Sequence, residues 1–228
     1  MATTQSSNTP QEQRTGGGVQ AAYDAIARSY DEQLHDELRF KPLDRALLDA
    51  FLELAGEGTV ADVGCGPGHI TRFLAARHTG VIGIDLSPAM IAIARERAPG
   101  LPFSVGSMLR LPAEDNAWAG AILLYSIIHL TADERAAACR ELARVVRPHG
   151  WLLIAFHIDS PDFAVGEVNH ITEWFGEAVD LDGFFLEPPQ VSRDVTAAGF
   201  GVVATTIRQP HPGIEYPSRR CYLLAQRR

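Results

Sequence analysis

Cysteine is scarce in this 228-residue chain. Its three cysteines, Cys65, Cys139 and Cys221, lie far apart, and no Cys-x-x-Cys or Cys/His pair has the spacing of a zinc site. Disulfide frameworks in small secreted domains use an even number of cysteines, which this chain lacks. We therefore expect free, reduced thiols and no bound metal.

Long apolar runs are also missing. The apolar runs, such as those at residues 121–124 and 152–156, have the length of a buried strand, whereas a membrane-spanning helix needs about 20 apolar residues. The first 20 residues contain no apolar core of the kind that a signal peptide carries. We expect a cytoplasmic protein that has no membrane partner.

An excess of positive charge is absent as well. The chain has 20 Lys and Arg against 28 Asp and Glu, which gives a net charge of −8. Nucleic-acid affinity rests mainly on basic side chains that neutralise phosphates, so a nucleic-acid partner is disfavoured and a small-molecule substrate is favoured. Hydrophobic residues make up 46% of the chain, which is ordinary for one globular domain of this length.

The chain divides into a polar beginning, a helical stretch and an alternation of strands and helices. Residues 1–18, rich in Thr, Gln, Ser and Gly, are expected to form a flexible tail, and residues 19–55 show helical periodicity. The remaining predicted elements are strands at 59–64, 81–85, 102–105, 119–125, 150–156, 200–207 and 220–225, and helices at 68–77, 88–98, 132–146 and 190–198.

This alternation predicts an α/β fold: a doubly wound, seven-stranded, mostly parallel sheet with helices on both faces. The last two strands are joined by a loop that has no room for a helix, so we expect the last strand to be antiparallel. The helices in residues 19–55 would form an N-terminal lid. The long, aromatic segment 158–189 is expected to be an irregular insertion after the fifth strand that covers the substrate.

A glycine-rich segment is the strongest motif. Residues 60–68 read Val-Ala-Asp-Val-Gly-Cys-Gly-Pro-Gly, so a buried strand ends in alternating glycines and runs directly into a helix. Glycine lets a ligand lie against the backbone, and the helix presents free N–H groups. A dinucleotide-binding loop has the spacing Gly-x-Gly-x-x-Gly, which differs from this one. A carboxylate at the strand end, Asp62, suits a cationic ligand better than a pyrophosphate.

A second acid, Asp85, ends the next predicted strand, seventeen positions beyond Gly68. In a doubly wound sheet it lies at the tip of the neighbouring strand, where its oxygens can accept hydrogen bonds from both ribose hydroxyls of an adenosine. Ser87 and Pro88 then begin a helix as its N-cap and first-turn proline. One glycine loop together with an acid at the end of each of two neighbouring strands predicts a ligand whose ribose hydroxyls are free.

These residues resemble the first two signature motifs of class I S-adenosylmethionine-dependent methyltransferases, in particular small-molecule enzymes similar to ubiquinone-biosynthesis methyltransferases. Residues 23–31, Tyr-Asp-Ala-Ile-Ala-Arg-Ser-Tyr-Asp, are similar to the Tyr-Asp-x-x-Ala-x-x-Tyr-Asp opening of that subgroup, whose helix closes over the cofactor. The resemblance covers residues 23–225. It implies S-adenosylmethionine as cofactor and a single methyltransferase domain at residues 19–228. Tyr23 and Tyr30 would equally suit the core of an amphipathic helix.

The resemblance also implies roles for individual residues. The glycines would line the methionine and ribose part, Asp62 would hold the ammonium group directly or through water, Asp85 would bind the ribose, and Leu86 would pack on the adenine. Two positions depart from the family pattern: its Gly-Asp after the third strand is Gly106-Ser107 here, and its Phe-Asp before the fourth is Ala119-Gly120. The predicted cofactor-binding residues are Tyr23, Tyr30, Asp62, Gly64, Gly66, Gly68, Asp85, Leu86, Ser107, Met108 and Tyr125.

The methyl acceptor should lie beyond the fourth and fifth strands. The segment 126–129 resembles the Ser-x-x-His form of small-molecule enzymes and lacks the Asn/Asp-Pro-Pro-aromatic motif of enzymes that methylate nucleobase or glutamine amino groups. His129 and His157 are candidate general bases, because imidazole titrates near neutrality. The predicted substrate-binding residues are Ser126, His129, His157, Asp159, His170, Trp174 and Tyr216. A structural role for each histidine, or a metal site formed by His157, Asp159 and His170, is the alternative.

Two other functions compete with methyl transfer to an O, N or C atom of an aromatic or partly apolar metabolite. A nicotinamide-dependent oxidoreductase or epimerase would also have a glycine-rich loop and an acid at the end of the next strand. The Gly-x-Gly-x-x-Gly spacing that binds a pyrophosphate is missing here, however. A non-catalytic relative would bind S-adenosylmethionine without turnover, since the chemistry needs no fixed catalytic side chain. For the oligomeric state, a monomer or a homodimer would be ordinary.

Overall fold

A central seven-stranded sheet organises the computed structural model, which describes residues 17–228. The strand order is β3-β2-β1-β4-β5-β9-β8. The strands are β1 (Thr59–Val63), β2 (Val81–Asp85), β3 (Phe103–Val105), β4 (Trp118–Leu124), β5 (Val146–Asp159), β8 (Phe200–Arg208) and β9 (Arg219–Arg227). β1 to β5 pair in parallel, and β9 is antiparallel to both of its neighbours. The predicted doubly wound sheet with an antiparallel last strand is therefore confirmed.

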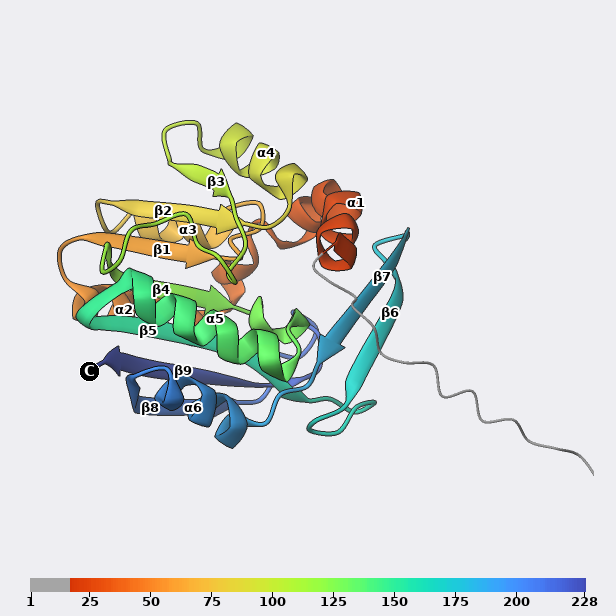
Figure 1. Cartoon of the computed structure of the whole chain (residues 1–228). Coiled ribbons are helices and arrows are strands. Elements are labelled where there is room, and N and C mark those ends of the chain that lie inside the picture. Colours follow the sequence, from red (N-terminus) through yellow and green to blue (C-terminus); the bar gives the residue numbers. More distant parts are fainter. Residues whose placement is uncertain (1–16) are drawn as a thin grey trace, which may run out of the picture.

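Helices cover both faces of this sheet. They are α1 (Gly17–Leu34), α2 (Pro42–Ala55), α3 (His69–Ala75), α4 (Pro88–Arg97), α5 (Ala132–Val145) and α6 (Pro188–Ala197), with 3₁₀ helices η1 (Glu37–Phe40) and η2 (Ile127–His129). In Figure 1, α5 and α6 lie in front of the sheet, α2 and α3 lie behind it, and α1 lies beyond the carboxyl ends of the strands, next to α4. Only α1 therefore occupies the position of a lid, whereas α2 packs on the sheet.

The buried strands are apolar along their whole length because both faces are covered. Successive residues of β4 and β5 point to opposite faces, so Leu123 and Ile154 belong to the core under α5 and α6. Ile122 and Leu153 belong to the core under α2 and α3, where Phe51 is fully buried. The sheet is thus held from both sides, and its carboxyl edge is left as the place for a ligand.

The insertion after β5 is more regular than predicted. It contains a hairpin of β6 (Val168–Trp174) and β7 (Glu177–Phe184), which pair in antiparallel fashion. The two-residue turn, Phe175 and Gly176, has positive φ at both positions (52° and 83°), as hairpin turns of this length require. Phenylalanine is uncommon in that conformation, so the sequence lacked the usual turn signal. The hairpin lies against α1 (Figure 1).

The beginning of the chain also differs from the prediction. Gly17 and Gly18 belong to the first turn of α1 and not to a flexible tail. The rest of the predicted tail, residues 1–16, lies outside the described residues. No helix within residues 17–228 is long and apolar enough to cross a membrane.

Candidate active site

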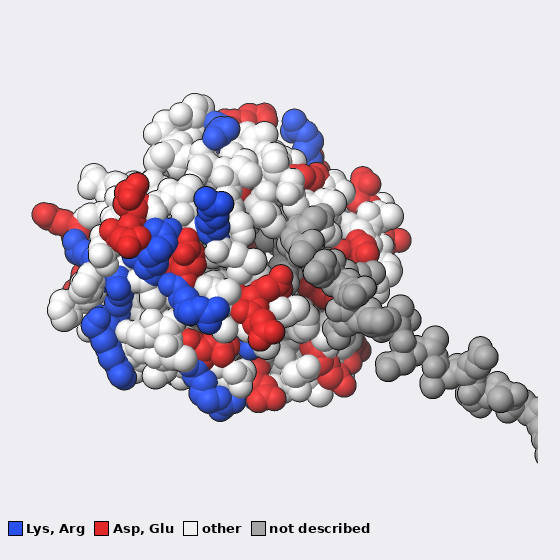
Figure 2. Space-filling model, in the orientation of Figure 1, with Lys and Arg blue, Asp and Glu red and all other residues white. Residues whose placement is uncertain are grey.

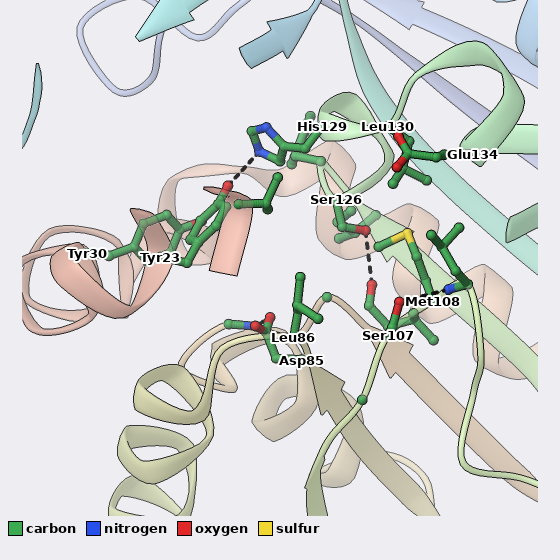
Figure 3. A pocket seen from close by; sticks show the side chains of 18 residues that line it. Tyr23, Tyr30, Asp85, Leu86, Ser107, Met108, Ser126, His129, Leu130 and Glu134 are labelled. Atoms are coloured by element: carbon green, nitrogen blue, oxygen red, sulfur yellow. Dashed lines mark hydrogen bonds between the residues drawn. The ribbon is translucent and has the colours of Figure 1, made fainter. Parts of the chain in front are cut away.

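A cavity of about 210 Å³ lies at the carboxyl edge of the sheet. Its walls come from the ends of β1, β2 and β4, the loop after β3, helix α1, η2 and the first turn of α5 (Figure 3). Most of the predicted cofactor residues line it, namely Tyr23, Tyr30, Gly64, Gly66, Asp85, Leu86, Ser107, Met108 and Tyr125, as do the predicted substrate residues Ser126 and His129. The fold therefore brings together residues that are more than 100 positions apart in the sequence.

The glycine loop is shaped by backbone conformations that other residues rarely adopt. Gly64 has a φ of 77°, and a Cβ there would lie 2.3 Å from the Cβ of Ser126. Gly66 has a φ of 53° and faces the cavity. A Cβ on Gly68 would lie 2.9 Å from the ring of Phe103, and Gly68 lines neither this cavity nor its neighbour. Close packing against Phe103 of β3 gives this glycine a structural reason, and its contact with the cofactor remains a prediction.

Asp85 ties the loop to the tip of β2. Its Oδ2 accepts a hydrogen bond from the backbone N–H of Gly66, and its Oδ1 accepts one from Ser87, both at 2.8 Å. Burial raises the pKa of this carboxyl, and the hydrogen bonds from Ser87 and Gly66 oppose the increase. Each oxygen keeps a further acceptor site for a hydroxyl. The arrangement suits the two hydroxyls of a ribose laid across the loop.

Asp62 lies deeper than predicted. It lines a second cavity of about 40 Å³, which adjoins the first and shares Tyr30, Gly64 and Gly66 with it. Thr71 Oγ1 donates a hydrogen bond of 2.6 Å to Asp62 Oδ2, and burial raises the pKa of Asp62 to about 6. A ligand that reaches Asp62 must therefore extend past the glycine loop into this smaller space.

Two residues of the second cavity have no counterpart among the predictions. His69 Nε2 lies 3.1 Å from Glu37 Oε1, and both side chains line this space. Burial opposes ionisation of Glu37, but His69 and Lys41 outweigh it and lower the pKa of Glu37 to about 2. Glu37 and Asp62 together give the cavity the negative charge that an ammonium group needs. Nothing in the sequence around Glu37 signals this position.

At the other end of the main cavity, Tyr23 and His129 are hydrogen bonded (Figure 3). His129 Nδ1 lies 2.8 Å from the backbone carbonyl oxygen of Asp182, which can only accept, so Nδ1 carries the proton. The Nε2 atom then accepts the hydrogen bond of 2.7 Å from the Tyr23 hydroxyl. Burial lowers the pKa of His129, which keeps the imidazole neutral. This pair joins α1, η2 and β7.

Helix α1 is held in place by contacts on both of its sides. Toward α4, Asp24 accepts hydrogen bonds from Ser87 Oγ (2.5 Å) and the backbone N–H of Ala89 (3.1 Å). Toward the hairpin, Tyr23 and Tyr30 each pack edge-to-face on Trp174 at 5.8 Å between ring centroids. Trp174 was predicted to bind substrate, but it does not line the cavity; it supports the tyrosines that do.

Tyr125 has a strained backbone at the end of β4. Its φ is 59°, its ring stacks on His157 at 5.0 Å, and its hydroxyl is 2.7 Å from the hydroxyl of Tyr222. Ser126 follows and donates a hydrogen bond of 3.0 Å to the carbonyl of Val63. Positive φ in a bulky residue costs on the order of 1–3 kcal/mol, and such strain is frequent at functional sites.

Besides Trp174, four predicted substrate residues lie outside the lining of both cavities. Burial lowers the pKa of His157 to about 3, and its Nδ1 is 2.6 Å from Ser218 Oγ. Asp159 forms an ion pair with Arg219, and half-exposed His170 pairs with Asp182 on the hairpin. Tyr216 packs edge-on against His157. Direct contact with a ligand in the cavity is therefore not supported for His157, Asp159, His170 or Tyr216. Within residues 17–228, no His, Cys, Asp and Glu side chains cluster as metal ligands.

The doubly wound sheet, the glycine loop and the acid at the tip of β2 define a class of protein: an α/β domain built to hold a nucleoside-containing ligand at its carboxyl edge. Residues 60–150 match the family described as "Methyltransferase domain". The trans-aconitate 2-methyltransferase of Methylobacterium nodulans is 37% identical over 110 residues, which are 46% of this chain and 40% of that enzyme.

The other comparisons extend along more of the chain. The 2-phytyl-1,4-naphtoquinone methyltransferase of Thermosynechococcus vestitus is 27% identical, over 84% of this chain and 98% of that enzyme. The solved structure of the magnesium protoporphyrin IX methyltransferase of Synechocystis, with bound S-adenosylmethionine, has the same fold (TM-score 0.67, 18% identity, 96% of this chain and 100% of that one). Together these comparisons support a class I S-adenosylmethionine-dependent methyltransferase with S-adenosylmethionine as its cofactor. This assignment sets aside the nicotinamide-dependent alternative.

Proposed function

We propose that this protein transfers a methyl group from S-adenosylmethionine to an oxygen, nitrogen or carbon atom of a small, uncharged, partly apolar metabolite. The observation that carries the proposal is one continuous cavity that runs from Asp85 at the tip of β2 to the Tyr23–His129 pair. The cofactor supplies an electrophilic methyl group on a sulfonium. The acceptor's lone pair would form a bond to the methyl carbon as the carbon–sulfur bond breaks, and the sulfur would leave as the neutral thioether of S-adenosylhomocysteine.

Asp85 would hold the ribose hydroxyls, and Gly64 and Gly66 would leave space for the ligand beside the backbone. Asp62 and Glu37 in the smaller cavity would hold the ammonium group, directly or through water. These contacts would place the reacting methyl group near Tyr125 and His129, and the cover formed by α1 and the hairpin would exclude water. Alignment and exclusion of water are the protein's main contributions to a direct displacement.

His129 is the candidate base for a hydroxyl or amine acceptor. Its Nε2 is an acceptor in the neutral tautomer and already accepts a hydrogen bond from the hydroxyl of Tyr23. An acceptor molecule beside Tyr23 would lose its proton to the tyrosine oxygen while the tyrosine proton passes to His129. His157, the other histidine considered for this role, lacks a place on the cavity wall.

The charge of the cavity argues against an anionic acceptor. Its acidic lining residues are Asp85 and Glu134, and neither Lys nor Arg is among the lining residues within the described chain. On the right-hand part of Figure 2, where the carboxyl ends of the strands lie, the charged side chains in view are mostly acidic. A carboxylate or phosphate would meet repulsion without a counter-charge. Neutral aromatic alcohols, quinols or amines fit these walls better.

The test is a methyl-transfer assay with purified protein, labelled S-adenosylmethionine and acceptors matched in ring size but differing in charge. Transfer to neutral acceptors and none to their carboxylated counterparts is the expected result. Binding of S-adenosylhomocysteine without transfer to any acceptor would favour the non-catalytic relative. The cytoplasmic location, a role in secondary metabolism, the absence of a nucleic-acid partner and a monomeric or homodimeric state remain predictions.

A further inference from the structure

We propose that Glu134, at the start of α5, recognises the adenine of the cofactor. Its free carboxylate oxygen accepts a hydrogen bond from the 6-amino group of adenine. The inference rests on the proposed function, because it assumes S-adenosylmethionine in the main cavity. It assigns a specificity role to a residue outside the glycine loop and outside the strand tips.

Glu134 lies at the correct end of the cavity. With the ribose at Asp85 and the methionine directed past Gly66, the base must extend toward the loop after β3. Glu134 lines the cavity together with Ser107 and Met108 from that loop, and Figure 3 shows it beside Leu130 on the same side as Met108.

Helix α5 is fixed against the same loop further along. The backbone N–H of Leu111 donates a hydrogen bond of 2.8 Å to Glu141 Oε1, and Arg144 donates one of 2.8 Å to the carbonyl of Ala113. Glu134 precedes Glu141 by seven residues, about two helical turns, so both side chains face the loop. The distance between Glu134 and the base is therefore set by a packed interface.

The carboxylate of Glu134 has one oxygen engaged and one available. Oε2 accepts hydrogen bonds from the backbone N–H of Thr131 (2.9 Å) and from Thr131 Oγ1 (2.8 Å). The first of these, with the hydrogen bond from the Glu134 N–H to Thr131 Oγ1, forms the capping box of α5. Oε1 has no hydrogen-bond partner among residues 17–228. The cap holds the carboxylate in one orientation, so the free oxygen is preorganised and loses little entropy on binding.

The other polar groups near the base already accept hydrogen bonds from backbone N–H groups. Ser107 Oγ accepts a hydrogen bond of 3.2 Å from the backbone N–H of Leu109. Asp85, the other acid that lines the cavity, accepts from two backbone N–H groups and lies at the ribose. Glu134 is thus the anionic acceptor that remains for an amino group, in a chain that has serine at position 107. The rest of the base would contact Leu86, Met108 and Leu130.

The test compares two ligands on three proteins by calorimetry. The ligands are S-adenosylhomocysteine and its 6-deamino analogue, in which the purine carries hydrogen in place of the amino group. In the wild type, the missing charge-assisted hydrogen bond should weaken binding about tenfold or more. Glu134→Gln keeps an oxygen for the cap but removes the charge, so the ratio of the two dissociation constants should fall to about threefold or less.

Asp133→Asn is the matched control, because it removes a neighbouring first-turn charge that does not line the cavity. Its ratio should equal that of the wild type. If Glu134 acted only as a helix cap, Glu134→Gln would change both affinities equally and leave the ratio unchanged, which would overturn the inference. If the wild type bound neither ligand, the proposed function itself would fail, and the two failures are therefore distinguishable.

Discussion

Two regions of the site are built in different ways. The floor, formed by Gly64, Gly66 and Asp85, is held by the backbone: positive φ angles, hydrogen bonds to main-chain N–H groups and strands buried on both faces. The cover, which consists of α1 and the β6–β7 hairpin, is held by side chains such as Tyr23 and Trp174. These differences lead us to propose that the floor fixes the cofactor and that the cover varies with the acceptor.

Each contact in the cover contributes less free energy than a distortion of the floor would cost. Aromatic pairs such as Tyr23–Trp174 contribute about 0.5–1.5 kcal/mol beyond their buried area, and a neutral hydrogen bond such as Tyr23–His129 about 1 kcal/mol. A steric clash or a wrong φ in the floor costs several kcal/mol, because nothing nearby can move. We expect substitutions in the floor to act on folding and cofactor binding, and those in the cover to act on turnover.

The largest effect is expected for Gly64→Ala. Its Cβ would clash with Ser126 at a φ of 77°, so the free energy of unfolding should fall by about 3 kcal/mol and binding of S-adenosylhomocysteine should be lost. Gly100→Ala is the control, since a Cβ there has nothing within 4 Å. Denaturant titration and calorimetry measure both quantities. Equal stability of the two variants would contradict the description of the floor.

Asp85→Ala tests the floor through its ligand contacts. Loss of two charge-assisted hydrogen bonds to the ribose should weaken binding of S-adenosylhomocysteine by about 2–4 kcal/mol. The same change frees the N–H of Gly66, so the melting temperature is measured in parallel to separate folding from binding. Wild-type affinity in a folded Asp85→Ala protein would show that the ribose lies elsewhere.

A smaller, pH-dependent effect on stability is expected from His157, whose ring stacks on that of Tyr125. Burial, then the charges of Arg220 and Lys41, lower the pKa of His157 from its usual 6.5 to about 3. Between these values the unfolded chain binds the extra proton, so stability falls as the pH falls below 6.5. Between pH 7.5 and pH 5, the wild type should lose about 1–2 kcal/mol more unfolding free energy than His157→Phe. If the unfolding free energy of the two proteins changed by the same amount between pH 7.5 and pH 5, this prediction would be wrong.

The smallest effects are expected in the cover. Tyr23→Phe removes the hydroxyl bonded to His129, so kcat should fall about tenfold while affinity for S-adenosylhomocysteine changes less than threefold. Tyr30→Phe is the matched control, because the Tyr30 ring packs on Trp174 in the same way. A similar loss of kcat in both variants would show that the effect is not specific to the hydroxyl bonded to His129, and it would contradict this prediction.

The floor could be predicted from the sequence because its signals are local. Glycines at residues 64, 66 and 68 and the acid that ends the next strand lie within 22 residues of one another, and together they imply one backbone geometry. The parallel direction of most strands followed from element alternation, and the antiparallel last strand followed from loop length. Gly68 shows the limit of this reasoning, since the same motif includes a glycine used for packing against Phe103.

The cover could be predicted only in part, because its contacts join distant segments. The Tyr23–His129 pair spans 106 residues and depends on the position of the hairpin, whose Phe175-Gly176 turn has no common sequence signal. Glu37, His69 and Glu134 reach the cavities through packing of η1, α3 and α5. The capping box at Thr131 and Glu134 marks the start of a helix, but it does not show which cavity that helix faces.

The most direct measurement is calorimetric titration of the purified protein with S-adenosylhomocysteine, and in parallel with NAD and NADP. We predict binding of S-adenosylhomocysteine in the micromolar range and no binding of either nicotinamide. Binding of a nicotinamide in place of S-adenosylhomocysteine would contradict the account from the glycine loop onward.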